Sequence, residues 1–115
     1  MRVIVCGDRN WRDYWAIYDV LNRLDRSSVI IHGAARGADQ MAGIIGKNLG
    51  FEVISVPAEW DKHGRAAGPI RNKKMLDMAP DLVIAFHEDI RNSKGTKNML
   101  DIAVKKGVKT ELYGS

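Results

Sequence analysis

The chain has 115 residues, of which 45% are hydrophobic and 28% are charged, a composition typical of one folded domain rather than of a disordered segment or a pair of domains. Its formal net charge of +4 is spread over Lys and Arg residues interspersed with acids, so charge alone does not select a polyanionic partner. The single cysteine, Cys6, excludes an intrachain disulfide, and the sequence holds neither a signal-peptide core nor an apolar run of roughly 18 residues. We therefore expect one cytoplasmic domain over residues 1–115, without membrane association.

Short apolar runs alternate with stretches of helical periodicity along the whole chain. Strands are predicted at residues 3–6, 29–32, 51–56, 82–86 and 109–113. Asp13 is a suitable N-cap for a first helix, whose apolar stripe includes Ile17 and Leu21. This alternation predicts an α/β fold, a Rossmann-like doubly wound domain with a mostly parallel five-stranded sheet and helices on both faces.

The later helices are predicted from their boundary residues. Gly43 and Gly46 weaken the second helix by roughly 1 kcal/mol each relative to Ala, which close packing on the sheet would explain. Residues 57–68 read as a long polar loop, after which Pro69 takes the first helical position and Arg71 lies in the first turn. Thr96 is predicted to cap the last helix.

The most informative stretch is His-Gly-Ala-Ala-Arg-Gly-Ala-Asp at residues 32–39, directly after a predicted strand. Gly33, Ala34 and Gly37 are small enough for backbone amides to approach a ligand closely. The start of the following helix favours phosphate or carboxylate, to which Arg36 can add a bidentate fork, and Asp39 suits the same helix dipole. A tight strand-to-helix turn without a ligand accounts for this stretch equally well.

Right-handed crossovers place the four strand-to-helix loops, residues 7–13, 33–37, 57–68 and 87–95, on one edge of the sheet, where such folds bind ligands. The loops carry both cations and acids. A mixed rim of this kind suits a phosphorylated, hydroxyl-rich ligand better than a long polyanion, although a solvated surface with incidental ion pairs is the simpler alternative.

The remaining candidates are aromatic or nucleophilic. Trp11 and Trp60 fall in predicted loops, where either could stack on a base or pack into the core. Nothing near Cys6 activates it as a nucleophile, and the three histidines lack metal-ligand spacing. We expect no metal and no cofactor.

Five ordered elements carry a family resemblance: the loop at 7–13, the 32–39 stretch, Pro-Ala-Glu-Trp at 57–60, Gly-Pro-Ile-Arg-Asn at 68–72 and Lys-Gly-Thr at 94–96. With them, nearly the whole chain resembles the SLOG superfamily of Rossmann-like domains, which includes the LOG-type phosphoribohydrolases and the DprA/Smf DNA-processing proteins. The resemblance implies a pocket for a nucleotide-like ligand lined by Gly33, Arg36, Gly37, Arg71, Gly95 and Thr96. With the loop residues above, the predicted ligand-binding set is Gly7, Arg9, Gly33, Ala34, Arg36, Gly37, Asp39, Trp60, Arg71, Asn72, Gly95 and Thr96.

Catalysis is less well supported by the resemblance. LOG-type enzymes pair an arginine, matched here by Arg71, with a glutamate three residues after the threonine of a Gly-Thr pair, where this chain has Met99. Arg71 is therefore the one catalytic candidate, and an acid would have to come from Asp8, Asp39 or Glu88. The leading interpretation is binding or sensing of a nucleotide or nucleotide-derived phosphate. The alternatives are an N-glycosidic hydrolase of the LOG kind and, less favoured by the mixed rim, DprA-like binding of single-stranded DNA.

Association with a second copy is also expected. The small core, the supply of Trp, Tyr and Met residues, and the resemblance to dimeric relatives together predict a homo-oligomer.

Overall fold

A five-stranded parallel sheet runs through the middle of the computed structural model, which describes residues 1–114. The strands are β1 (Arg2–Gly7), β2 (Val29–His32), β3 (Glu52–Ser55), β4 (Leu82–Phe86) and β5 (Lys109–Tyr113). They lie in the order β3-β2-β1-β4-β5, and every neighbouring pair is parallel. The predicted α/β fold is confirmed, with a sheet that is parallel throughout.

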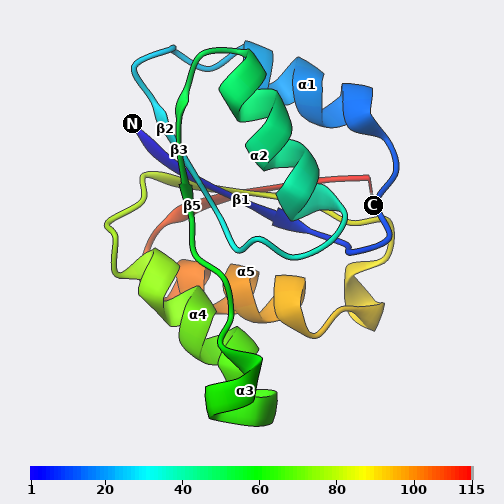
Figure 1. Cartoon of the computed structure of the whole chain (residues 1–115), viewed down its shortest axis with the longest axis vertical. Coiled ribbons are helices and arrows are strands. Elements are labelled where there is room, and N and C mark those ends of the chain that lie inside the picture. The colour runs from blue at the N-terminus through cyan, green and yellow to red at the C-terminus, as the bar shows by residue number, and fades with distance from the viewer. Residues whose placement is uncertain (115) are drawn as a thin grey trace.

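Helices cover both faces of this sheet (Figure 1). The helices α1 (Tyr14–Asn22) and α2 (Ala38–Asn48) lie on one face, and α4 (Ala67–Leu76) and α5 (Gly95–Lys105) lie on the other. Alternate residues of β1 serve the two layers, since Val3 and Val5 pack with α1 and α2 whereas Ile4 and Cys6 pack with α4 and α5. The central strands are apolar along their length because both of their faces are buried.

The first two helices begin and pack as the sequence predicts. The Asp13 carboxylate caps α1 by accepting a hydrogen bond from the Ala16 amide at 3.1 Å. In α2, a Cβ on Gly43 would lie 2.7 Å from His32 Nε2, and one on Gly46 would lie 3.0 Å from a Val53 methyl group. Close packing on the sheet is therefore the reason for both glycines.

The segment predicted as a loop at residues 57–68 is partly helical. It contains the single-turn helix α3 (Trp60–His63) and the 3₁₀ turn η1 (Gly64–Ala66), and α4 begins at Ala67 instead of Pro69. Pro69 is the third residue of α4, a position it tolerates because amides in the first turn have no acceptor within the helix.

The predicted cap of the last helix is wrong by three residues. After the 3₁₀ turn η2 (Ile90–Asn92), Ser93 Oγ accepts hydrogen bonds from the amides of Thr96 at 3.0 Å and Lys97 at 3.3 Å. Thr96 is instead buried inside α5. Ser93 takes this role because its own backbone is extended, as N-cap geometry requires.

The strand order changes direction between β1 and β4, which creates a crevice beyond their carboxyl ends. From β1 the chain proceeds to β2 and β3 on one side, whereas β4 and β5 lie on the other. Among the described residues, no helix is long and apolar enough to span a lipid bilayer.

Candidate functional site

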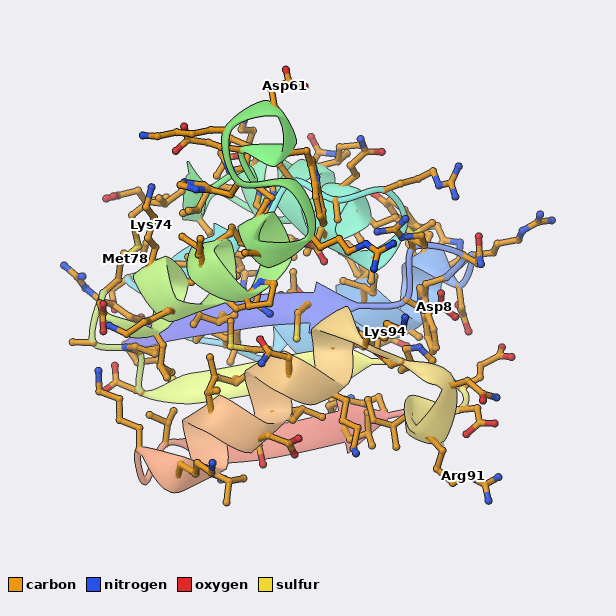
Figure 2. All side chains as sticks on the ribbon, turned by 90° about the horizontal axis from the view of Figure 1, so that it is seen from below. Asp8, Asp61, Lys74, Met78, Arg91 and Lys94 are labelled. Atoms are coloured by element: carbon orange, nitrogen blue, oxygen red, sulfur yellow. The ribbon has the colours of Figure 1, made fainter. Side chains whose placement is uncertain are left out.

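A cavity of about 420 Å³ lies at the carboxyl ends of β1 and β4. Its walls come from the loop after β1, the loop after β4 and the inner faces of α2, α4 and α5. Figure 2 shows Asp8 and Lys94 at this end of the sheet, with Lys74 and Met78 at the opposite end. The lining residues are Cys6, Gly7, Asp8, Arg9, Asn10, Ala35, Asp39, Arg71, Asn72, Met75, His87, Asn92, Ser93, Lys94, Gly95 and Thr96.

A second cavity of about 470 Å³ adjoins the first and shares Arg9, Ala35 and Arg71 with it. It is also lined by Gly33, Ala34, Arg36, Pro57, Ala58 and Trp60. Three arginines therefore line this space, and none of its lining residues is acidic. The Trp60 side chain, 53% exposed, forms part of the rim.

Arg71 lines both cavities, and hydrogen bonds to other groups of the protein fix its side chain. Its Nη1 donates to the carbonyl oxygen of Gly33, and its Nε donates to Asn72 Oδ1 at 2.9 Å. The buried Asn72 in turn donates from Nδ2 to the Gly95 carbonyl at 3.2 Å and to Asn98 Oδ1 at 3.0 Å. Burial lowers the pKa of Arg71, and the nearby Asp39 carboxylate opposes that shift.

Asp39 is a buried carboxylate at the start of α2. Its Oδ2 accepts a hydrogen bond from the Gly33 amide at 2.9 Å, and the amides of Ala35 and Gly7 also favour its charged form. Burial nevertheless raises its pKa from 3.8 to about 6, against the opposing effect of Arg71. The sequence predicts that amides of the small-residue loop face the phosphate or carboxylate of a ligand. In the structure, amides of this loop instead face the Asp39 carboxylate of the protein itself.

Amides at the start of α5 also donate hydrogen bonds to a side chain of the protein. Ser93 Oγ accepts hydrogen bonds from the amides of Thr96 and Lys97, and Thr96 is one of the residues predicted to bind the ligand. Arg9, Arg36 and Lys94 are exposed cationic residues in the lining of the two cavities.

Most of the predicted ligand-binding residues lie around the two cavities. Gly7, Arg9, Asp39, Arg71, Asn72, Gly95 and Thr96 line the first, and Gly33, Ala34, Arg36 and Trp60 line the second. Gly37 lines neither cavity. It has a φ of +81°, and a Cβ there would overlap the backbone of Asp8 and Arg9. Its small size is required by the contact between two loops of the protein.

Several lining residues were not in the predicted set. These are Cys6, Asp8, Asn10, Ala35, Met75, His87, Asn92, Ser93 and Lys94 of the first cavity, together with Pro57 and Ala58 of the second. Asp8 and His87 directly follow β1 and β4, so their place after the two strands at the switch point was a usable signal.

The other sequence candidates belong to the core. Trp11 is buried, packs on Phe86 with ring centroids 5.6 Å apart and donates from Nε1 to the Asp13 carbonyl, so its ring is unavailable to a base. Burial raises the pKa of the Cys6 thiol, an effect that Asp39 reinforces, which disfavours the nucleophilic thiolate. Within residues 1–114, His, Cys, Asp and Glu side chains form no cluster of three or more suited to a metal ion.

Comparison with known proteins agrees with this architecture. The chain is 34% identical over 122 aligned residues to the Gene 61 protein of Mycobacterium phage D29, covering 98% of this chain and 96% of the relative. It also resembles the X-ray structure of DNA processing protein A (DprA) from Streptococcus pneumoniae, with a TM-score of 0.82 at 19% identity. That likeness covers 96% of this chain but 49% of the DprA chain, and at this identity it establishes the fold alone.

Residues 1–63 match a family described as YAcAr, the YspA, cpYpsA-related SLOG family. The matched residues include every residue that lines the second cavity except Arg71, and seven of the sixteen that line the first. On this match and on its fold, the chain is a member of the YspA, cpYpsA-related SLOG family.

Proposed function

We propose that this chain binds a nucleotide or nucleotide-derived phosphate at the carboxyl edge of its sheet. The observation that supports the proposal is the second cavity, where Arg9, Arg36 and Arg71 border a space that has no carboxylate in its lining and carries Trp60 on its rim. Guanidinium groups bind phosphate oxygens in bidentate fashion, and an exposed indole offers a face on which a base can stack.

The adjoining cavity suits the sugar of such a ligand. Asp8 and Asn92 line it with oxygens that can accept hydrogen bonds from ribose hydroxyls. Because Asp39 and Ser93 already accept several of the loop amides, we propose that side-chain cations hold the phosphate in place of the backbone.

Replacement of Arg36 tests the phosphate contact. Arg36→Ala is expected to weaken AMP binding at least tenfold, since a charge-assisted hydrogen bond contributes about 1.5–3 kcal/mol. Arg65→Ala is the matched control, because Arg65 is an exposed arginine of the neighbouring turn η1 that lines neither cavity. Calorimetric titration with AMP and with ribose 5-phosphate measures both variants. Equal losses in the two variants would show that only the general positive charge matters.

Replacement of Trp60 separates base from phosphate. Trp60→Ala is expected to reduce AMP affinity by about 1–3 kcal/mol, the range for stacking of a base on an aromatic side chain, and to leave ribose 5-phosphate affinity unchanged. A loss of the same size for both ligands would argue against stacking.

The hydrolase alternative depends on an acid close to Arg71. Met99, at the position of the family's glutamate, is fully buried in the core between α5 and the sheet, so an acid would have to come from Asp8 or Asp39 in the first cavity. We expect no release of adenine from AMP. Steady release by the purified protein, lost in Arg71→Ala to a greater extent than AMP binding is, would identify an enzyme instead.

The DNA-binding alternative rests on the same arginines and Trp60, and on the fold shared with DprA. It predicts tighter binding of oligothymidylate than of AMP, with an affinity that falls steeply as salt is raised. We expect AMP to bind more tightly at physiological salt.

A further inference from the structure

A cavity of about 500 Å³ lies outside the site described above, between α2 and the β2–β3 side of the sheet. It is lined by His32, Ala34, Gln40, Gly43, Ile44, Lys47, Val53 and Ser55, and shares only Ala34 with the two cavities of the candidate site. None of these residues is acidic, and four of them carry a side-chain hydrogen-bond donor.

His32 is the buried polar group of this cavity, with 8% of its surface exposed. Its Nδ1 accepts a hydrogen bond from the Ala34 amide at 3.0 Å, so the neutral ring carries its proton on Nε2. Nε2 lies beside Gly43, where an added Cβ would be only 2.7 Å from it, and among residues 1–114 it has no hydrogen-bond acceptor. Burial lowers the pKa of His32, with Lys47 and Arg71 adding to the shift, so the ring is a neutral donor at neutral pH.

The charge of the lining selects the ligand. With His32 neutral, Lys47 supplies the only formal charge, which matches one negative charge better than the two of a phosphate monoester. Ile44, 57% exposed, and the half-buried Val53 add an apolar surface beside the donors.

From this arrangement we propose that the cavity binds an aliphatic monocarboxylate. Its carboxylate accepts hydrogen bonds from His32 Nε2–H and the Lys47 ammonium group, and its alkyl chain lies over Ile44 and Val53. The site is independent of the proposed nucleotide site, because Lys47, Ile44 and Val53 line neither of the other cavities.

A titration followed by NMR tests the proposal. Addition of butyrate is expected to shift the His32 imidazole signals in a saturable way, whereas butyramide, which lacks the charge, and inorganic phosphate bind more weakly. Lys47→Gln is expected to weaken butyrate binding about fivefold, the effect of an exposed ion pair. Lys105→Gln is the matched control, because Lys105 occupies the last turn of α5 as Lys47 occupies that of α2.

Gly43→Ala provides a second test, since its methyl group would lie 2.7 Å from His32 Nε2 and block access to the ring. It is expected to abolish the His32 response, and an unchanged AMP affinity would confirm that it folds. The proposal is overturned if butyramide or phosphate binds as tightly as butyrate, or if Lys47→Gln binds butyrate as the wild type does. Butyrate-induced shifts confined to Arg9 and Arg71 would also overturn it.

Discussion

Asp39 shows how one buried side chain determines what the candidate site can accept. Its carboxylate occupies amides that would otherwise face a ligand, and it lies close enough to Arg71 to moderate the charge of that guanidinium. Gly33 makes the arrangement possible, because a Cβ there would overlap Arg71 and lie 2.9 Å from Asp39 Oδ2. The site therefore contains a carboxylate that opposes the positive charge of Arg71 even without a ligand.

The raised pKa of Asp39 predicts a pH effect on stability. Because the folded state holds this proton up to about pH 6 and the unfolded state releases it near 3.8, the Asp39 contribution to the free energy of unfolding falls as pH rises between these values. The difference in the free energy of unfolding between the wild type and Asp39→Asn should therefore change by about 3 kcal/mol over this pH window, at 1.36 kcal/mol per pKa unit. Urea unfolding of both proteins between pH 4 and 7 measures it, and a difference that does not vary with pH would contradict it.

Residue-level roles in the site were only partly predictable from the sequence. Gly33, Arg36 and Arg71 were identified from small-residue patterning and from the family resemblance. The role of Asp39 as the acceptor for the loop amides was not predicted. The hydrogen bond from the Gly33 amide to Asp39 depends on a turn in which Ala34 has a φ of +58°, a conformation that non-glycine residues rarely adopt. Trp11 and Trp60 both fall in predicted loops, so the sequence does not distinguish them. In the structure Trp11 packs against Phe86 and is buried, whereas Trp60 is exposed.

At the level of elements, the strands were predicted well and the helix starts less well. The apolar runs of β2 and β4 match these strands to the residue because strands buried on the sheet are rich in apolar residues. The predicted bounds of β5 are also correct, although none of its residues is buried. The starts of α4 and α5 depend on local backbone geometry, and the hydroxyl that caps α5 comes from Ser93, which the pattern did not distinguish from Thr96.

The Ser93 cap predicts a stability change. Ser93→Ala removes the acceptor of two α5 amides and should lower the free energy of unfolding by about 1 kcal/mol. Ser27→Ala is the matched control, because the Ser27 hydroxyl donates to Asp25 in an exposed turn and caps no helix. Urea denaturation compares the variants, and equal stability of the two would show that Ser93 does not act as the cap.

At the scale of the whole molecule, the predicted homo-oligomer remains a prediction. The most exposed large apolar side chains of the helices lie on three different helices, with Trp15 on α1 at 65% exposure, Ile44 on α2 at 57% and Val104 on α5 at 64%. Trp15 stands out, since its ring contacts Tyr14 and Tyr18 with centroids 5.1 and 5.2 Å apart.

We expect this aromatic cluster to lie in the contact between copies. Sedimentation analysis at micromolar concentration should give a multimeric mass for the wild type and a smaller one for Trp15→Arg, because a charge would then be buried in an apolar contact. Val104→Arg, on the opposite helical layer, should leave the mass unchanged. A wild-type mass of one chain would contradict the prediction.

The first cavity takes its walls from both helical layers, with Asp39 in the first turn of α2 on one face and Arg71, Gly95 and Thr96 from α4 and α5 on the other. The sheet separates the two layers, and we expect them to open as separate cooperative units in the free protein. A ligand that contacts both must be released before either layer can open locally. Amide hydrogen exchange in α2 and α4 should therefore slow together when the cavity fills, although the two helices lie on opposite faces of the sheet.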